Sequence, residues 1–123
     1  MYVIGGEHPL KDRARRALER AVLRRERLVA DAEVYQEVLH RYTAIGRREA
    51  IGPAFDLLDR VLDEVLPVDN AAVHRARDLL AAHPALSARD ALHAAVMEHH
   101  GIHSIMTFDT GFDGLPGIER VAD

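Results

Sequence analysis

Short apolar segments alternate with longer amphipathic segments along most of this chain, and this alternation limits the folds it can adopt. The apolar segments expected to form strands are residues 27–30, 64–68, 104–108 and 118–121. The segments with helical periodicity are residues 10–26, 32–44, 48–62, 71–82 and 87–100. Strands separated by helices favour a mostly parallel sheet with helices on its faces. We therefore expect an α/β protein in which residues 1–123 form a single domain.

Residues that start or stop helices support these boundaries. Asp31 and Asn70 each precede an expected helix and can act as its N-cap. Gly46 and Gly101 each follow one and can end it. Gly52-Pro53 is expected to bend or break the helix in which it lies.

The composition excludes several classes of protein. Cysteine is absent, which rules out disulfides and thiolate metal sites and fits a cytoplasmic protein. No apolar run approaches the ~20 residues that a membrane span needs. The chain also lacks a glycine-rich phosphate loop and a Gly-x-Ser-x-Gly nucleophile motif.

The net charge of −4 does not indicate a nucleic-acid binder, but the charges are unevenly distributed. Half of all lysine and arginine residues lie between Lys11 and Arg27. This basic segment can follow a phosphate backbone or can form an ordinary solvated helix face. The solvated face is favoured slightly, because the segment has no aromatic side chain that would stack on a base.

Acidic residues mark residues 86–117 as the candidate site. Asp90 lies in the first turn of an expected helix, Asp109 follows the expected strand 104–108, and Asp113 comes four residues later. Strand ends and helix starts are the places where α/β proteins build their sites. Hard oxygen ligands in such a place favour Mg²⁺ or Mn²⁺ over zinc.

Each of these acids also has a purely structural interpretation. Ser87-x-x-Asp90 is close to a capping box, and this local pattern alone favours a structural role. Asp109 is an ordinary residue at which a strand stops, and Asp113 can simply begin the turn Gly114-Leu115-Pro116-Gly117, so each alone is as much a structural as a functional candidate. Together, however, the three acids favour a site, because they lie at adjacent strand-end and helix-start positions. Acids that crowd one place repel each other unless a divalent cation neutralises them.

Glu37 and the histidines leave further alternatives open. At ~100° per residue, Glu37 lies about 60° from Val34 on the helix, at the margin of the apolar stripe, where a solvated side chain is the more common outcome. His93 follows Asp90 by three residues and can either contact the site or pack in the core. The group His99-His100-x-x-His103 lacks the i, i+4 spacing of a helical zinc pair, and a solvated helix end is favoured.

Three segments of this chain resemble the PIN-domain ribonucleases, and most closely the VapC-type toxins of bacterial toxin–antitoxin pairs. The segments are Tyr35-Gln36-Glu37-Val38-Leu39-His40, Leu86-Ser87-Ala88-Arg89-Asp90-Ala91-Leu92-His93-Ala94-Ala95 and Met106-Thr107-Phe108-Asp109-Thr110-Gly111-Phe112-Asp113. They occur in register over nearly the whole chain, with Val65-Leu66-Pro67-Val68 between them.

The resemblance implies a three-layer α/β/α fold and Mg²⁺- or Mn²⁺-dependent hydrolysis of RNA. It also implies a homodimer and a cognate antitoxin protein that inserts near the acidic site. By position, Glu37 resembles the family's helix glutamate, Asp90 its later metal-binding aspartate, and Asp109 and Asp113 its strand-end pair. On this basis Asp90 and Asp109 hold the metal, while Glu37 and Asp113 complete its shell or orient the attacking water.

One departure from the family concerns the N-terminus. The family begins with a strand that ends in a metal-binding aspartate, whereas Met1-Tyr2-Val3-Ile4-Gly5 resembles the residues that follow this aspartate. We therefore expect the first strand to be missing, the centre of the sheet to be unfilled, and metal binding to be impaired. The alternatives are a catalytically impaired remnant that only dimerises or binds an antitoxin, and a metal-dependent DNA nuclease. The sequence does not distinguish RNA from DNA, because phosphate contacts carry no base identity.

Overall fold

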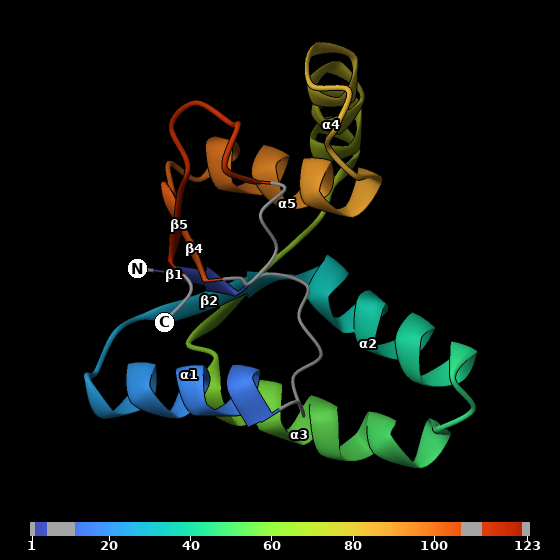
Figure 1. The fold of residues 1–123 in the computed structure, drawn as a ribbon, viewed down its shortest axis with the longest axis vertical. Helices are drawn as coiled ribbons and strands as arrows, with labels where there is room; N and C mark the ends of the chain where they lie inside the picture. Colours follow the sequence, from blue (N-terminus) through green and yellow to red (C-terminus); the bar gives the residue numbers. More distant parts are fainter. Residues whose placement is uncertain (1, 5–11, 107–111, 122–123) are drawn as a thin grey trace.

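A parallel sheet forms the centre of the computed structural model, which describes residues 2–4, 12–106 and 112–121 (Figure 1). In these residues the sheet has five strands in the order β3-β2-β1-β4-β5, and every neighbouring pair is parallel. The strands are β1 Tyr2–Ile4, β2 Leu28–Asp31, β3 Glu64–Leu66, β4 Ser104–Met106 and β5 Glu119–Val121. The expected parallel α/β architecture is therefore confirmed.

The expectation of a missing first strand is wrong for this structure. β1 lies at the centre of the sheet, where Tyr2 is in register with Leu28 of β2 and Val3 with Ile105 of β4. An open position here would leave backbone N–H and C=O groups of β2 and β4 unpaired in the interior, which is unfavourable. The short apolar segment Tyr2–Ile4 fills the position and satisfies these groups.

Helices cover both faces of the sheet. In the order of the chain they are α1 Asp12–Leu23, α2 Ala32–Ala44, the 3₁₀ turn η1 Arg48–Ala50, α3 Ile51–Val61, α4 Asn70–Ala82 and α5 Ala88–His99. Figure 1 shows α1, α2 and α3 on one side of the sheet and α4 and α5 on the other. This arrangement gives the three layers that the resemblance implied.

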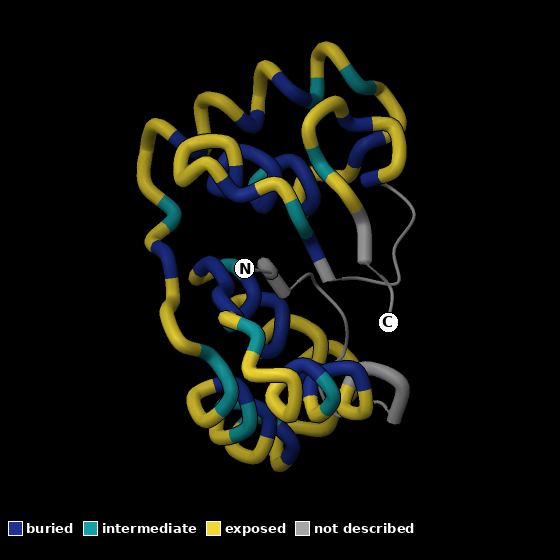
Figure 2. Tube along the Cα trace, turned by 90° about the vertical axis from the view of Figure 1, so that its left-hand side faces the viewer, coloured by how far each residue is buried: buried dark blue, intermediate teal, exposed yellow. Residues whose placement is uncertain are grey.

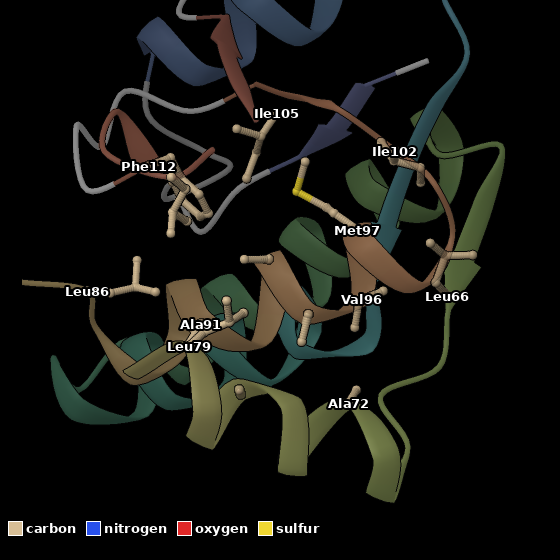
Figure 3. Packing of buried hydrophobic residues seen from close by; sticks show 14 of the residues in the cluster. Leu66, Ala72, Leu79, Leu86, Ala91, Val96, Met97, Ile102, Ile105 and Phe112 are labelled. Carbon is tan, nitrogen blue, oxygen red and sulfur yellow. The ribbon is translucent and has the colours of Figure 1, made fainter. Parts of the chain in front are cut away.

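Two hydrophobic cores separate these layers, and β2 contributes to both. Val29 belongs to the core beneath α4 and α5, whereas Leu28 and Ala30 belong to the core beneath α1, α2 and α3. This division follows from the alternation of side chains along a strand. Figure 3 shows the first core, in which Met97 extends from α5 toward the sheet. In Figure 2 the exposed residues lie mainly on the outer turns of the helices.

The helix ends confirm most of the predicted boundaries and correct one N-cap. Gly46 and Gly101 follow α2 and α5 with φ of 71° and 66°, a backbone region that glycine adopts readily. Asn70 is the first residue of α4 rather than its cap. The preceding Asp69 is the N-cap, and its Oδ1 accepts a hydrogen bond of 2.9 Å from the Ala72 backbone N–H.

The predicted break at Gly52-Pro53 occurs slightly earlier, where η1 ends at Ala50 and α3 begins at Ile51. Pro53 then lies in the first turn of α3, where a missing N–H is tolerated. No helix in the described part of the chain combines the length and the apolar character needed to cross a membrane.

Candidate functional site

The site begins with Asp31, the last residue of β2. Because side chains alternate along a strand, Asp31 points to the same face as Val29, toward α5, and its side chain is fully buried. Asp31 occupies the N-cap position of α2, but its carboxylate forms no capping hydrogen bond. Its Oδ2 instead lies 2.6 Å from Nδ1 of His93 on α5. The expected cap is therefore correct in position and wrong in the role of its side chain.

Glu37 comes from the buried face of α2. Val34 and Val38 on either side of it pack in the core, and this packing turns Glu37 inward, so that only 7% of its surface is exposed. Its Oε1 lies 2.9 Å from Nε2 of His93. The solvated position that the helical pattern favoured is wrong, because α5 packs over this edge of α2.

His93 joins the two carboxylates and is itself completely buried. Both of its ring nitrogens face carboxylate oxygens that accept, so each nitrogen donates a hydrogen bond and the ring is an imidazolium. Burial alone would lower the pKa of His93, but the hydrogen bonds to Asp31 and Glu37 outweigh it and raise the pKa to about 10. One positive charge therefore offsets two buried negative charges.

Asp90 lies one turn before His93 on the same helix. Ser87 is the N-cap of α5, and its Oγ accepts a hydrogen bond of 3.2 Å from the Asp90 backbone N–H, which confirms this half of the predicted capping box. Asp90 is nevertheless only 6% exposed. Residues three apart on a helix share a face, so Asp90 and His93 lie on the face of α5 that meets Glu37.

The two remaining predicted acids belong to the segment after β4. Asp113 is exposed and follows Phe112, whose buried ring anchors this segment in the core with α5. Asp109 lies outside the described residues, as do the other positions from 107 to 111. The described structure thus brings Glu37 and Asp90 to facing helices, whereas the joint site of all four acids stays a prediction.

Two further charged side chains, Glu33 and Arg89, interact electrostatically with the cluster of Asp31, Glu37 and His93. Partial burial raises the pKa of Glu33, and the Glu37 and Asp31 carboxylates raise it further. The charges of His93 and Arg89 act in the opposite direction. Glu33 and Arg89 therefore lie near the buried cluster, one at the start of each helix.

Sequence reasoning missed Asp31 as a member of this cluster and left His93 undecided. The signal for Asp31 was present, since it continues the run Leu28-Val29-Ala30 in phase with the core residue Val29. Two oxygens of the cluster, Asp31 Oδ1 and Glu37 Oε2, are buried and have no hydrogen-bond partner among the described residues.

These unpartnered oxygens are hard ligands of the kind that Mg²⁺ and Mn²⁺ prefer, so the donor chemistry fits a divalent cation. Within residues 2–4, 12–106 and 112–121, no three ligand side chains are arranged to hold a metal ion by themselves. A zinc site at His99, His100 and His103 gains no support from the described residues either. The exposed His103 lies 3.1 Å from the Gly117 carbonyl through its Nδ1.

Comparisons with known proteins agree with this architecture. The PIN domain family matches residues 1–118. VapC ribonuclease Mb1869c of Mycobacterium bovis is 58% identical over 122 residues, which cover 99% of this chain and 93% of the relative. Ribonuclease VapC23 of Mycobacterium tuberculosis is 43% identical over 109 residues, which cover 89% of this chain and 86% of the relative.

Solved structures show the same fold at lower identity. Mycobacterium tuberculosis VapC20, described as a toxin that cleaves the sarcin-ricin loop, matches with a TM-score of 0.76 and 20% identity over 94% of this chain and 95% of its own. VapBC2 from Rickettsia felis, bound to a promoter DNA fragment, matches with a TM-score of 0.73 and 13% identity over 98% of this chain and 96% of its own. Taken together, the buried acids on facing helices, the parallel sheet and these relatives show that the chain belongs to the PIN-domain family, among the VapC proteins.

Proposed function

We propose that this protein is an Mg²⁺- or Mn²⁺-dependent endoribonuclease and the toxin of a type II toxin–antitoxin pair. The observation that carries the proposal is the buried Glu37 carboxylate, which faces α5 and keeps Oε2 without a partner among the described residues. The 58% identity to a VapC ribonuclease supports the same activity. A buried acid with an unused oxygen is costly for folding alone, and a site that binds a cation accounts for it.

In this proposal Asp90 and Asp109 hold the metal, and Glu37 and Asp113 complete its shell or orient the attacking water. When bound, a divalent cation supplies a lowered water pKa and stabilises charge on the leaving oxygen. Asp90 is suited to its role because Ser87 fixes the first turn of α5 and because the acid is largely removed from solvent. Glu37 is suited to its role because His93 fixes one oxygen and leaves the other unpaired within the described structure.

The alternative of an impaired remnant depended on two expectations: an unfilled sheet centre, and the absence of the aspartate that ends the family's first strand. β1 occupies the centre in the structure, which removes the first ground, whereas Tyr2–Ile4 includes no aspartate, so the second ground stays. We propose the active nuclease because Glu37 and Asp90 are buried on facing helices, and the level of its activity is the quantity to measure.

RNA as substrate, an antitoxin as partner, a homodimer and a cytoplasmic location belong to the same proposal. A further solved structure with this fold is a toxin–antitoxin complex from Klebsiella pneumoniae, with a TM-score of 0.68, 17% identity, and coverage of 97% of this chain and 96% of its own. In this proposal the groups available to contact the RNA backbone include the exposed Arg15, Arg16, Arg24 and Arg25 on α1 and the loop after it.

The test is cleavage of a labelled single-stranded RNA by the purified chain with Mg²⁺ or Mn²⁺. Asp90→Ala is expected to abolish cleavage while the protein stays folded. Asp78→Ala, at an exposed position on α4, is the matched control and should retain cleavage. Loss of folding in Asp90→Ala would instead favour the capping-box role. A DNA strand of the same length tests the DNA alternative, and equal cleavage of both strands would contradict the assignment to RNA.

A further inference from the structure

His93 contacts two carboxylates through its two ring nitrogens, and this geometry does more than neutralise their charge. His93 Nδ1 lies 2.6 Å from Asp31 Oδ2, and His93 Nε2 lies 2.9 Å from Glu37 Oε1. All three side chains are buried, and they come from β2, α2 and α5. The ring is therefore held at both ends between separate elements of the fold.

This arrangement restricts the orientation of Glu37. A free glutamate can rotate its carboxylate so that either oxygen faces a ligand. Here the bond from Nε2 selects Oε1 and leaves Oε2 buried, with no hydrogen-bond partner among the described residues. Asp31 in turn stops the ring from rotating, since its carboxylate binds the opposite nitrogen.

We propose that His93, anchored by Asp31, is a positioning residue that fixes the Glu37 carboxylate and reserves its Oε2 for the divalent cation of the site. This inference rests on the proposed function, since it assigns Oε2 to the metal of that site. Partners of metal-binding side chains act in this way in other proteins, where their loss lowers metal affinity by roughly 10- to 100-fold.

Two substitutions of His93 separate positioning from charge. The amide nitrogen of glutamine reaches the place of Nε2, so His93→Gln can still donate to Glu37. The amide nitrogen of asparagine reaches the place of Nδ1, so His93→Asn can donate only to Asp31. Both variants lose the positive charge, so any difference between them reports the contact with Glu37.

Binding of Mn²⁺ alone to the full chain, measured by calorimetry, is the main readout, and kcat and KM for RNA cleavage follow. We expect His93→Asn to bind Mn²⁺ at least about tenfold more weakly than His93→Gln and to lower kcat more than it raises KM. Equal affinities in the two variants, or weaker binding by His93→Gln, would overturn the inference. His74→Asn, an exposed histidine on α4, is the control and should bind Mn²⁺ as the unmodified protein does.

Asp90→Asn distinguishes the inference from the function on which it rests. If the unmodified protein binds Mn²⁺ and Asp90→Asn does not, while the two His93 variants are equal, only the positioning role fails. If the unmodified protein does not bind Mn²⁺, the metal site and the positioning role fail together.

A measurement on the unmodified protein covers the case in which the His93 variants do not fold. With ¹⁵N-labelled histidine, addition of Mg²⁺ should shift the Nε2–H resonance of His93, which faces Glu37, more than its Nδ1–H resonance, which faces Asp31. Equal shifts, or no shift while Mg²⁺ raises the melting temperature, would overturn the inference.

Discussion

The buried imidazolium predicts how the stability of this protein changes with pH. The pKa of His93 rises from 6.5 to about 10 on folding, because the hydrogen bonds to Asp31 and Glu37 outweigh desolvation. Below pH 6.5 the ring is charged in both the folded and the unfolded chain, so its full stabilisation is present. Between pH 6.5 and about 10 only the folded chain keeps the proton, so unfolding releases it and a higher pH favours unfolding.

The size of this effect on the free energy of unfolding follows from the rise in the pKa of His93. At roughly 1.4 kcal/mol per pKa unit, a rise of this size corresponds to an upper limit on the order of 5 kcal/mol. Removing one partner of a buried ion pair costs about 3–5 kcal/mol in other proteins, which is the same range. We therefore expect His93→Gln to lower the free energy of unfolding by a few kcal/mol at pH 6 and by much less at pH 10.

The assay is urea unfolding followed by circular dichroism from pH 6 to pH 10. The difference in unfolding free energy between the unmodified protein and His93→Gln should shrink steadily as the pH rises. His74→Gln is the matched control, since this exposed ring bonds the Asn70 carbonyl rather than carboxylates. A difference between the unmodified protein and His93→Gln that stays constant over this range would refute the reasoning.

Three further predictions concern the caps, the core and the metal. Asp69→Ala should destabilise the protein by about 1 kcal/mol, and Asn70→Ala by clearly less, because only Asp69 caps α4; urea unfolding measures both, and equal losses would contradict the assignment of the cap. Leu58→Ala, at a fully buried position, should cost about 2–5 kcal/mol, whereas Leu39→Ala, at a position 45% exposed, should cost much less in the same assay. Chelation with EDTA should stop RNA cleavage and added Mn²⁺ should restore it, and cleavage that persists in EDTA would contradict a metal-dependent mechanism.

The sequence was most informative where a signal is local and repeated. Helical periodicity located α2, α4 and α5 to within about one residue at their ends, and short apolar runs located β2 to β5. The capping bond from Ser87 was also predictable, because its whole geometry lies within one turn. The choice between Asp69 and Asn70 was not, since both residue types can cap a helix and only the backbone decides which one does.

The features that the sequence did not predict depend on packing between distant segments. β1 is a strand of only three residues, and its place follows from pairing with β2 and β4 rather than from its own pattern. Glu37 lies at the margin of the apolar stripe of α2, and the packing of α5 determines that this margin is buried. Resemblance to a family identified Glu37 as a candidate, but only the structure shows that Asp31 and Glu37 are the partners of His93.

The central place of β1 has a consequence for the time course of folding. The partner of Val3 on one side is Val29, which follows early in the chain, but its partner on the other side is Ile105, close to the C-terminal end of the described chain. During synthesis the hydrogen bonds between β1 and β4 therefore cannot form until β4 has left the ribosome, long after β1 has done so. Such long-range pairing slows folding, so closure of the sheet centre is expected to be a late step in the folding of these residues.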